Sequence, residues 1–313
     1  MERRSLGRSG LKTPRLVLGG NVFGHTAKGE DAFAILDRFI DAGGTIIDTA
    51  DVYSAWVPSH KGGESEALLG EWLKRRGGRD QVLIATKVGY AGGLSRAHIE
   101  QAVDGSLRRL GIDTIDLYYA HKDDPETPLA ETLQALDALV QAGKVRTIGA
   151  SNYSAPRLVE ALDISEAQGL ARFEVLQPLY NLMERDEFEG DLQRLCIDRE
   201  IGVLPYFGLA SGFLTGKYRS QADLGKSKRG DAVAKYLGEC GNGVLDALDI
   251  VAEETAATPA QVALAWLAAQ PSVTAPIASA TTMAQIEDLA GAMTLELRAD
   301  QVERLTLAST KAA

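Results

Sequence analysis

Eight short apolar runs recur along the chain, each followed by a loop and then a longer stretch in which apolar residues return every three or four positions. The runs are nearly continuous in hydrophobicity, as is typical of parallel strands that are covered by helices. Eight such alternations over about 250 residues indicate an α/β fold of the (β/α)8 TIM barrel type. The predicted strands span residues 15–20, 45–50, 82–87, 115–121, 145–151, 173–180, 202–208 and 274–279.

An open, doubly wound sheet is the alternative arrangement of such strands and helices. It usually has fewer strands and a glycine-rich first turn of the form GxGxxG. The segment LGGNVFGHT, which follows the first predicted strand, has its glycines at other spacings. The pattern therefore favours the barrel, and we expect one domain over residues 1–313.

Two of the predicted helices have recognisable ends. The stretch RAHIEQAVDGSLRRLG carries apolar residues at helical spacing, and Ser95 is its expected N-cap. In TPAQVALAWLAAQP, Thr258 is the expected N-cap and Pro259 occupies the first helical position. These signals fix where the two helices begin.

Two segments fall outside the repeat. The turn signal Ser9-Gly10 separates two short β-prone runs, which predicts an N-terminal β-hairpin that closes the bottom of the barrel. Residues 209–243 follow the seventh strand and are rich in Gly, Lys and Arg. Because loops of that length in a compact domain are usually functional or disordered, we expect a long functional loop after strand seven.

The composition indicates in which cellular compartment the protein resides and which classes of molecule it binds. The 33 basic and 43 acidic residues give a net charge of −10, which argues against a nucleic acid or an anionic membrane as partner. No window approaches the roughly 18 apolar residues of a membrane span, and the N-terminal residues lack a signal-peptide core. Cys196 and Cys240 have no CxxC neighbour, which fits a reducing compartment. We expect a cytoplasmic protein that acts on a small molecule, and a homo-oligomer stays open.

Charged and polar residues stand at the ends of consecutive predicted strands. Strand two ends on Asp48 with Tyr53 just beyond, strand three ends on Lys87, and strand four ends on His121. In a barrel the carboxyl ends of the strands form one mouth, where the chemistry takes place. A buried carboxylate is costly unless a cation pairs with it, and Lys87 is the expected partner of Asp48.

These four residue types suggest the reduction of a carbonyl group. A tyrosine hydroxyl has a reference pKa of about 10, and a nearby ammonium favours the phenolate. We therefore expect Lys87 to lower the pKa of Tyr53, Asp48 to keep Lys87 charged, and His121 to donate a hydrogen bond to a substrate oxygen. Tyr53 would then act as general acid toward the alkoxide that forms when a hydride arrives from the other side.

Five ordered segments carry a resemblance to a known family. IIDTADVYS, IATK, LYYAHKDDPETPLAETLQALDALVQAGKVRTIGASNYS, LQPLYNLMER and SGFLTGKYR resemble the aldo-keto reductase superfamily, in register over nearly the whole chain. The catalytic tetrad of that family is matched in order by Asp48, Tyr53, Lys87 and His121. The resemblance implies a (β/α)8 barrel that binds NADP(H) without a Rossmann domain and reduces aldehydes or ketones. Within the superfamily, the chain resembles the branch that includes the potassium-channel β subunits.

The resemblance also implies where the cofactor binds. Ser151, Asn152 and Gln177 would hold the nicotinamide carboxamide, and Tyr206 would stack on the nicotinamide ring. Loops after the last two strands of a barrel, together with a helix N-terminus, commonly bind phosphate. The other implied contacts are Gly20, Asn21, Asp48, Phe207, Gly208, Leu209, Lys217 at the pyrophosphate, Arg229 and Thr281 near the 2′-phosphate, Ser279 through its backbone, and Gln285 and Asp288 at the adenine.

The segment SATTMAQ departs from the pattern of many relatives. Those relatives have Lys or Arg directly after strand eight, where this chain offers only hydroxyls and an amide. The potassium-channel β branch uses an arginine from the preceding loop, and Arg229 in GKSKRGD is the matching candidate. The pattern favours NADP(H) and leaves NAD(H) open.

Two other functions fit parts of the pattern. A metal-dependent hydrolase on the same barrel would use His121, Asp48 and Asp51 as ligands, but the chain lacks the HxH pair expected at a strand end. We therefore expect no metal site. A non-catalytic NADP-binding subunit that senses redox state fits the potassium-channel β resemblance.

The substrate is only coarsely visible in the sequence. Phe23, Trp56 and Phe207 lie in loops that would surround the mouth, which suggests aromatic or apolar carbonyl compounds. The physiological substrate and the direction of the reaction do not follow from the residues.

Overall fold

The computed structural model describes residues 2–226 and 230–310. Its central sheet has eight parallel strands, namely β3 (Val17–Gly19), β4 (Ile46–Asp48), β5 (Leu83–Val88), β6 (Ile115–Ala120), β7 (Val145–Ser151), β8 (Phe173–Gln177), β9 (Gly202–Val203) and β10 (Ile277–Ala278). Their order is β10-β3-β4-β5-β6-β7-β8-β9. Each strand overlaps one of the eight predicted runs.

Backbone hydrogen bonds join the two ends of this sheet. Thr274 N donates to Val203 O at 2.9 Å, and Ile277 N donates to Pro205 O at 2.9 Å. The segment before β10 thereby pairs with β9, while β10 itself pairs with β3. The sheet is closed, and the predicted (β/α)8 barrel is confirmed.

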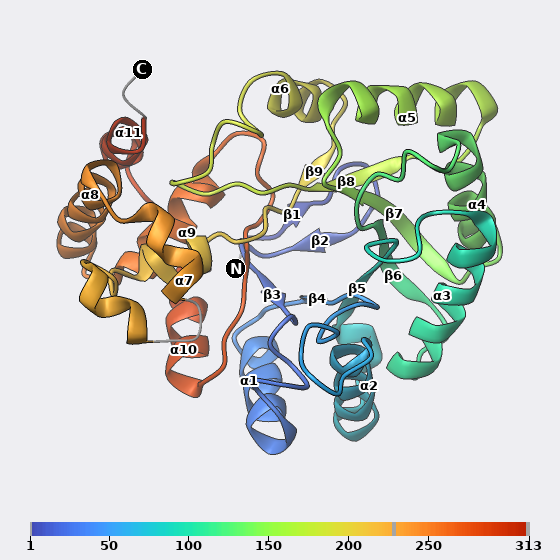
Figure 1. Ribbon diagram of the computed structural model, residues 1–313, viewed down its shortest axis with the longest axis horizontal. Helices are drawn as coiled ribbons and strands as arrows, with labels where there is room; N and C mark the ends of the chain where they lie inside the picture. Colours follow the sequence, from blue (N-terminus) through green and yellow to red (C-terminus); the bar gives the residue numbers. More distant parts are fainter. Residues whose placement is uncertain (1, 227–229, 311–313) are drawn as a thin grey trace.

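Helices surround the strands as a ring when the molecule is viewed as in Figure 1. They are α1 (Gly29–Asp41), α2 (Glu64–Arg76), α3 (Arg96–Leu110), α4 (Leu129–Gln141), α5 (Ala155–Gln168), α6 (Asp191–Asp198), α8 (Glu239–Thr255), α9 (Pro259–Ala269), α10 (Met283–Ala292) and α11 (Ala299–Ala308). Both expected caps are present: Ser95 accepts a hydrogen bond from His98 N, and Thr258 forms a capping box with Gln261. The sequence signals therefore placed these helix starts correctly.

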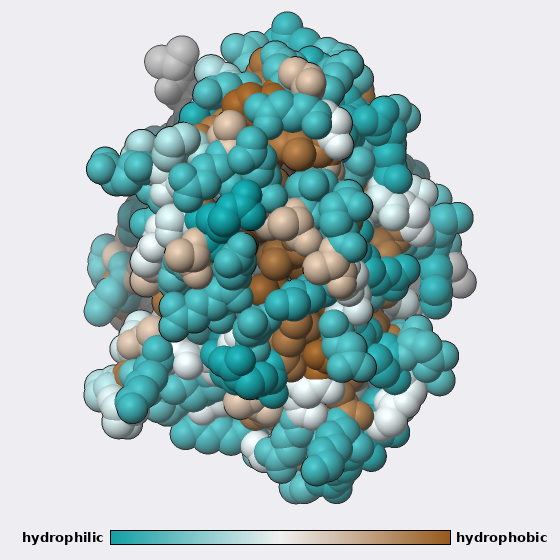
Figure 2. Space-filling model, turned by 90° about the vertical axis from the view of Figure 1, so that its right-hand side faces the viewer, coloured by the Kyte–Doolittle hydropathy of each residue, from teal (hydrophilic) through white to brown (hydrophobic). Residues whose placement is uncertain are grey.

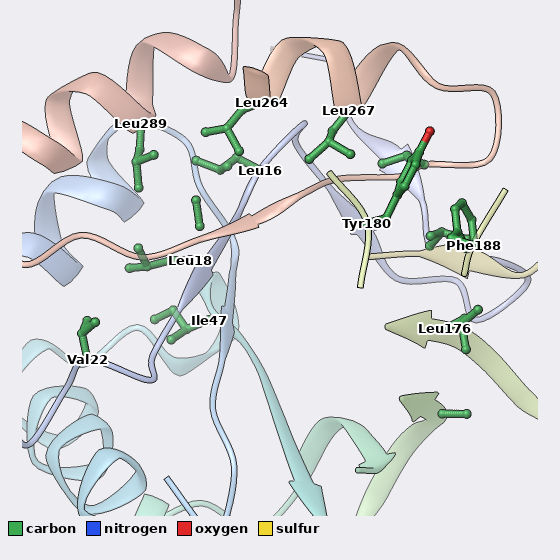
Figure 3. Close-up of a cluster of buried hydrophobic side chains, with 14 of the residues drawn as sticks. Leu16, Leu18, Val22, Ile47, Leu176, Tyr180, Phe188, Leu264, Leu267 and Leu289 are labelled. Carbon is green, nitrogen blue, oxygen red and sulfur yellow. The ribbon is translucent and has the colours of Figure 1, made fainter. Parts of the chain in front are cut away.

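Successive residues of a strand enter two different cores. In β3, Val17 belongs to the cluster inside the barrel and Leu18 to the cluster between the strands and the helices. Figure 3 shows part of the outer cluster, where Leu16 lies beside Leu264 of α9 and Leu18 points toward Leu289 of α10. Because side chains alternate between the two faces of a strand and both faces are buried, the strands appear as continuous apolar runs in the sequence.

The N-terminal hairpin closes the bottom of the barrel, as predicted. Its strands are β1 (Arg4–Ser5) and β2 (Lys12–Thr13), which are antiparallel and cross the middle of the ring in Figure 1. Leu6 and Leu11, in the connection between them, pack into the inner cluster. Gly7 has a φ of +54°, and a Cβ at this position would lie 2.3 Å from Glu174 O of β8. Glycine is therefore required for the hairpin to approach the barrel so closely.

Inside the barrel, the large ring of Tyr119 lies against a glycine, Gly149. Tyr119 of β6 is fully buried inside the barrel. A Cβ on Gly149 of β7 would lie 2.7 Å from this ring. Gly149 therefore leaves the space that Tyr119 fills.

The connection between β9 and α8 is built differently from the expected long loop. It contains two 3-10 helices, Ala210–Thr215 and Gln221–Lys226, then the short α7 (Gly230–Val233) and a further 3-10 turn, Ala234–Tyr236. Phe213, Leu214, Tyr218 and Val233 are fully buried, so apolar residues hold this segment on the core. Most residues of this segment are polar, and its apolar residues follow no regular spacing. The sequence pattern therefore did not predict that the segment packs on the core.

The outer surface is mainly polar on the side that Figure 2 presents, which is the right-hand side of Figure 1. Hydrophobic residues are visible there between hydrophilic ones, as expected where helices turn their apolar faces inward. No helix in residues 2–226 and 230–310 is both long enough and apolar enough to cross a bilayer.

Candidate active site

The lysine at the end of β5 joins three groups from β4 and the loop after it. Lys87 Nζ donates to Asp48 Oδ2 at 2.6 Å, to Thr49 O at 2.7 Å and to Tyr53 Oη at 2.9 Å. An ammonium has three donors, so each of them has an acceptor here. The structure thus brings together three of the four residues predicted at the strand ends.

Asp48 is a buried carboxylate with both oxygens paired. It is 2% exposed and Lys87 is 0% exposed. Its second oxygen, Oδ1, accepts a hydrogen bond from Gln177 Nε2 at 2.9 Å. A buried ion pair is tolerated only when its remaining hydrogen-bonding groups are satisfied, and this one meets that condition.

His121 completes the group from the end of β6. Its ring centre lies 6.1 Å from that of Tyr53. Its backbone is fixed on both sides, because His121 N donates to Val88 O at 2.8 Å and Asn152 Nδ2 donates to His121 O at 2.9 Å. Burial, together with the charges of Lys87 and Lys122, lowers the pKa of His121 to about 3. The imidazole is therefore neutral near pH 7 and carries one N–H donor.

The pKa of Tyr53 shifts in the opposite direction to the one expected from the sequence. Burial raises it, the ammonium of Lys87 lowers it by a smaller amount, and Asp48 adds to the rise. The effect of Lys87 has the predicted sign, but desolvation of the phenolate outweighs it. For Lys87 itself, burial opposes the charge, yet Asp48 and Tyr53 more than offset burial and raise the pKa. Lys87 is thus charged, as predicted, while Tyr53 keeps its proton.

Side-chain amides and hydroxyls form a continuous chain across the ends of β7, β8 and β9. Ser151 Oγ donates to Gln177 O at 2.8 Å, and Asn152 Nδ2 donates to Ser151 Oγ at 3.1 Å. Tyr206 Oη donates to Asn152 Oδ1 at 2.8 Å. Through Gln177 the chain continues to Asp48, so these predicted residues lie beside the lysine site.

Backbone strain gathers around the same mouth. Most non-glycine residues avoid positive φ, and those that adopt it often mark functional sites. Among the described residues, six such positions lie in the connections after β4, β7 and β9: Ser54 (77°), Ser59 (74°), Asn152 (56°), Phe207 (54°), Ala210 (46°) and Ser211 (58°).

A buried asparagine that the sequence did not single out supports one of these strained residues. Asn181 is 0% exposed, and its Nδ2 donates to Phe207 O at 3.0 Å. Its Oδ1 accepts from Met183 N at 2.8 Å. Asn181 therefore ties the loop after β8 to the loop after β9, and a polar residue within an otherwise apolar run was the signal for it.

The loops after β3 and β10 meet at two of the predicted cofactor residues. Ser279 Oγ donates to Asn21 Oδ1 at 2.6 Å. Gly20 N donates to Asp48 O at 2.6 Å, and Ser65 Oγ donates to Gly20 O at 2.8 Å. Gly20 thus lies directly beside the end of β4, and Asn21 links it to Ser279 after β10.

The start of α10 gathers the residues predicted for the adenosine end. Thr281 N and Oγ1 both donate to Gln285 Oε1, at 2.7 and 3.0 Å. Asp288 Oδ1 accepts from Thr258 Oγ1 at 2.7 Å, which links α10 to the start of α9. Asp288 therefore already has a structural partner.

The residue predicted at the pyrophosphate is an exposed lysine in the connection after β9. Lys217 is exposed, and its Nζ lies 5.1 Å from the centre of the Tyr218 ring. Gly208 packs against α9, and Leu209 is partly buried next to it. Arg229, the predicted 2′-phosphate ligand, lies outside the described residues.

Exposed aromatic side chains line the mouth. Trp56 is 56% exposed and Phe207 48% exposed, whereas Phe23, also predicted there, is fully buried in the outer core. Tyr90, which is 54% exposed, was not predicted. Its ring lies 4.9 Å from His121, and the Trp56 ring lies 5.9 Å from Tyr53. The only signal for Tyr90 was an aromatic residue three positions after Lys87.

Comparison with known proteins decides the family. The sequence model of the Aldo/keto reductase family matches residues 15–309. The chain belongs to this family. It is therefore an oxidoreductase of the class that acts on small carbonyl compounds with a nicotinamide cofactor.

Relatives of this aldo/keto reductase carry different names. The chain is 33% identical over 303 residues to a probable voltage-gated potassium channel subunit beta of Arabidopsis thaliana, covering 92% of this chain and 90% of the relative. It is 34% identical over 310 residues to the uncharacterized oxidoreductase YrpG of Bacillus subtilis, covering 95% and 92%. It is 32% identical over 304 residues to an L-glyceraldehyde 3-phosphate reductase of Escherichia coli, covering 92% and 86%.

The hydrolase alternative needs a cluster of metal ligands. In the part of the chain that the structure describes, no group of three His, Cys, Asp or Glu residues is placed to hold a metal ion. Asp48 is occupied by Lys87 and Gln177, so it is not free to act as a ligand beside His121 and Asp51. The family and this pairing both favour the reductase.

Asp51, between the aspartate and the tyrosine of the site, has a strongly shifted pKa. Burial and the negative charge of Glu66 raise it to about 7, against the opposing effects of Arg109 and Lys87. Glu66 is itself fully buried and accepts hydrogen bonds from Thr86 Oγ1 at 2.6 Å and Arg109 Nε at 2.7 Å. Asp51 therefore takes up a proton on folding between its ordinary pKa and about pH 7.

This shift predicts a pH-dependent effect of Asp51→Asn on stability. The folded state binds the proton more tightly than the unfolded state, so the aspartate destabilises the fold increasingly as pH rises from about 4 to above 7. We expect Asp51→Asn to raise the melting temperature at pH 8 and to have little effect at pH 4, as measured by thermal unfolding. Asp113→Asn, at an exposed position, is the control. An equal change at both pH values in Asp51→Asn would contradict the prediction.

Proposed function

We propose that this aldo/keto reductase reduces aldehydes or ketones to alcohols with NADPH, and that Tyr53 donates the proton. The observation that supports this most directly is the contact of Lys87 Nζ with both Asp48 and Tyr53 Oη, next to a neutral His121. An ammonium held against a tyrosine hydroxyl stabilises the phenolate that remains after proton transfer.

The residues around the mouth fit a nicotinamide cofactor. Ser151, Asn152 and Gln177 present a hydroxyl and two amides side by side, which suits recognition of a carboxamide. The Tyr206 ring, held by Asn152, is available to stack on the nicotinamide. When bound, the cofactor supplies the hydride that reduces the carbonyl carbon.

The protein residues supply the proton and the electrostatic stabilisation. Tyr53 keeps its proton in the resting state, because burial raises its pKa. As negative charge grows on the substrate oxygen, the Tyr53 O–H bond breaks and the proton passes to that oxygen, which becomes the alcohol. The neutral His121 donates a hydrogen bond to the same oxygen and orients it. Lys87, kept charged by Asp48, stabilises the phenolate until solvent returns a proton to it.

Cofactor preference is the first test of this proposal. Lys217, Thr281 and Arg229 are the proposed ligands of the phosphates. We expect NADPH to bind at least about tenfold more tightly than NADH, the size of one charge-assisted phosphate contact. Fluorescence titration can follow binding, because Trp56 is exposed at the mouth whereas Trp72 and Trp266 are buried.

Variants separate the role of Arg229 from a general effect of charge. We expect Arg229→Gln to bring the two affinities close together. Arg219→Gln, in the same connection, is the matched control, because the Arg219 guanidinium is already held by Asp249 at 2.7 Å. Equal affinities in the parent protein would remove the NADP preference, and binding of neither cofactor would contradict the proposed function.

A non-catalytic NADP-binding subunit is the second candidate, which the similarity to a probable potassium channel subunit beta favours. Both functions require cofactor binding, so affinity does not separate them. Turnover does: sustained consumption of NADPH with a reactive aldehyde such as 4-nitrobenzaldehyde supports the enzyme. A single stoichiometric oxidation of bound NADPH, without turnover, supports the sensor.

We also propose a cytoplasmic location for the enzyme. Cys196 and Cys240 are both free thiols in the structure. A reducing compartment preserves such thiols.

A further inference from the structure

Lys122 lies at the rim of the mouth, and the ring of Tyr90 contacts both Lys122 and His121. Lys122 follows His121 directly, and its Nζ lies 5.2 Å from the centre of the Tyr90 ring. The other neighbour of Tyr90 is His121, whose ring centre is 4.9 Å away. The charge of Lys122 reaches the imidazole, since it contributes, after burial and Lys87, to the low pKa of His121. Lys122 therefore lies close enough to affect a molecule bound at His121.

The acids next to Lys122 in the sequence are committed to other partners. Asp123 Oδ1 accepts from Arg157 Nε at 2.9 Å. Asp124 Oδ2 accepts from Leu94 N and from Thr127 Oγ1, both at 2.7 Å. Within residues 2–226 and 230–310, no carboxylate forms an ion pair with Lys122. Its charge acts on Asp124 and contributes, after the hydrogen bonds to that carboxyl, to its low pKa. Because no direct ion pair holds it, the exposed ammonium remains available to an anion from outside.

The rings of the mouth show where that anion would lie. Trp56, Tyr53, His121 and Tyr90 follow one another with ring centres 5.9, 6.1 and 4.9 Å apart. A carbonyl oxygen held by Tyr53 and His121 thus has Trp56 next to the first of these rings and Tyr90 next to the second. Lys122 lies on the Tyr90 side, so a substituent that extends from the carbonyl past Tyr90 meets the ammonium.

The negative net charge of the chain makes the positive charge of Lys122 more important for binding an anionic substrate. At −10, the protein as a whole repels anionic substrates. The charge of Glu187 acts on Tyr206 and contributes, after burial, to the raised pKa of that tyrosine. An anionic group of a substrate is therefore attracted by Lys122 and repelled by Glu187.

We propose that Lys122, placed against Tyr90, selects carbonyl substrates that carry an anionic group, either a carboxylate or a phosphate. The inference rests on the proposed reduction and adds the substrate class. The anionic group is unchanged in the reaction, in which the carbonyl carbon gains the hydride and its oxygen gains the proton of Tyr53. Lys122 acts on binding and orientation, through an ion pair at the rim.

Matched pairs of substrates test this selection. The carboxylate pair is 4-oxobutanoate and its neutral methyl ester, and the phosphate pair is glyceraldehyde 3-phosphate and glyceraldehyde. The measured quantity is the ratio of kcat/KM for the anionic and the neutral member. We expect Lys122→Met to lower this ratio by about three- to tenfold, as for the loss of a partly exposed ion pair or charged hydrogen bond. Whichever pair shows the larger loss identifies the anion that the site prefers.

Further variants distinguish charge from shape. Lys122→Arg should retain the ratio of the parent, and Lys122→Glu should favour the neutral substrate. Lys74→Met, at an exposed position on α2, should leave the ratio unchanged. Added salt should lower the ratio in the parent more than in Lys122→Met, because screening weakens the ion pair.

Binding without turnover gives an independent readout. Quenching of Trp56 fluorescence by 4-hydroxybutanoate and by butane-1,4-diol compares an anionic and a neutral product. We expect the anion to bind more tightly to the parent and to lose that advantage in Lys122→Met. If the ratios stay the same in Lys122→Met and Lys122→Glu while the neutral carbonyls are reduced, the inference is overturned and the proposed function stands. If NADPH binds but no carbonyl is reduced, the proposed function fails, and the binding comparison alone decides the role of Lys122.

Discussion

Replacing Tyr53 with phenylalanine should lower kcat for carbonyl reduction by about 10²- to 10⁴-fold, the usual contribution of a general acid. The substitution removes the hydroxyl that Lys87 Nζ contacts at 2.9 Å and keeps the ring beside Trp56. The affinity for NADPH should stay within a few-fold of the parent, because the amide and hydroxyl chain at the end of β7 is untouched. Steady-state kinetics and fluorescence titration on the same preparation measure the two effects.

A second tyrosine provides the control for this substitution. Tyr153 is 3% exposed, and its hydroxyl has no hydrogen-bond partner within the described residues. We expect Tyr153→Phe to retain the kcat of the parent. A Tyr53→Phe protein with an unchanged rate would assign the proton to another donor.

Lys87→Met should have the largest effect on stability, lowering the free energy of unfolding by about 3–5 kcal/mol. The substitution leaves the Asp48 carboxylate buried with Gln177 as its remaining partner, and removes the donor from Thr49 O. Reduction should also be lost, because nothing then stabilises the phenolate of Tyr53. Urea unfolding measures the first effect and steady-state kinetics the second.

A double variant and a surface pair separate the two effects. Asp48→Asn combined with Lys87→Met removes both charges, so we expect it to recover much of the stability and none of the activity. The ion pair of Lys144 with Asp104 has the same 2.6 Å separation but is partly exposed, at 40% and 47%. Lys144→Met should therefore cost less than about 1 kcal/mol. Similar losses for the two lysines would show that burial does not set the energy of the Asp48 pair.

The placement of the strands and of the strand-end residues could be predicted because each depends on short-range patterns. Continuous apolar runs marked strands buried on both faces, and a barrel brings their carboxyl ends together, so Asp48 and Lys87 had to be neighbours. The hairpin plug followed in the same way from a turn signal outside the repeat.

Other features depend on burial in the folded protein and could not be predicted from the sequence. The sign of the pKa shift of Tyr53 is a balance between desolvation and the charge of Lys87, and only the fold determines how much water the hydroxyl loses. Phe23 lies in a loop by sequence yet is fully buried by packing. Tyr90 and Lys122 face the mouth because of the loop paths after β5 and β6, which no periodicity encodes.

The pairing of Tyr119 with Gly149 has a consequence for directed evolution of this enzyme. The Tyr119 ring lies 5.9 Å from Lys87 Nζ on one side and leaves no room for a Cβ at position 149 on the other. A larger residue at position 149 would displace the ring toward the lysine, so mutations selected for heat tolerance inside the barrel would also change the chemistry. Libraries for thermostability are better directed to the layer between strands and helices, such as Leu18 and Leu264, which is separated from Lys87 by the barrel wall. Libraries for new activity gain most at Trp56 and Tyr90, where an exposed side chain can change without repacking the core.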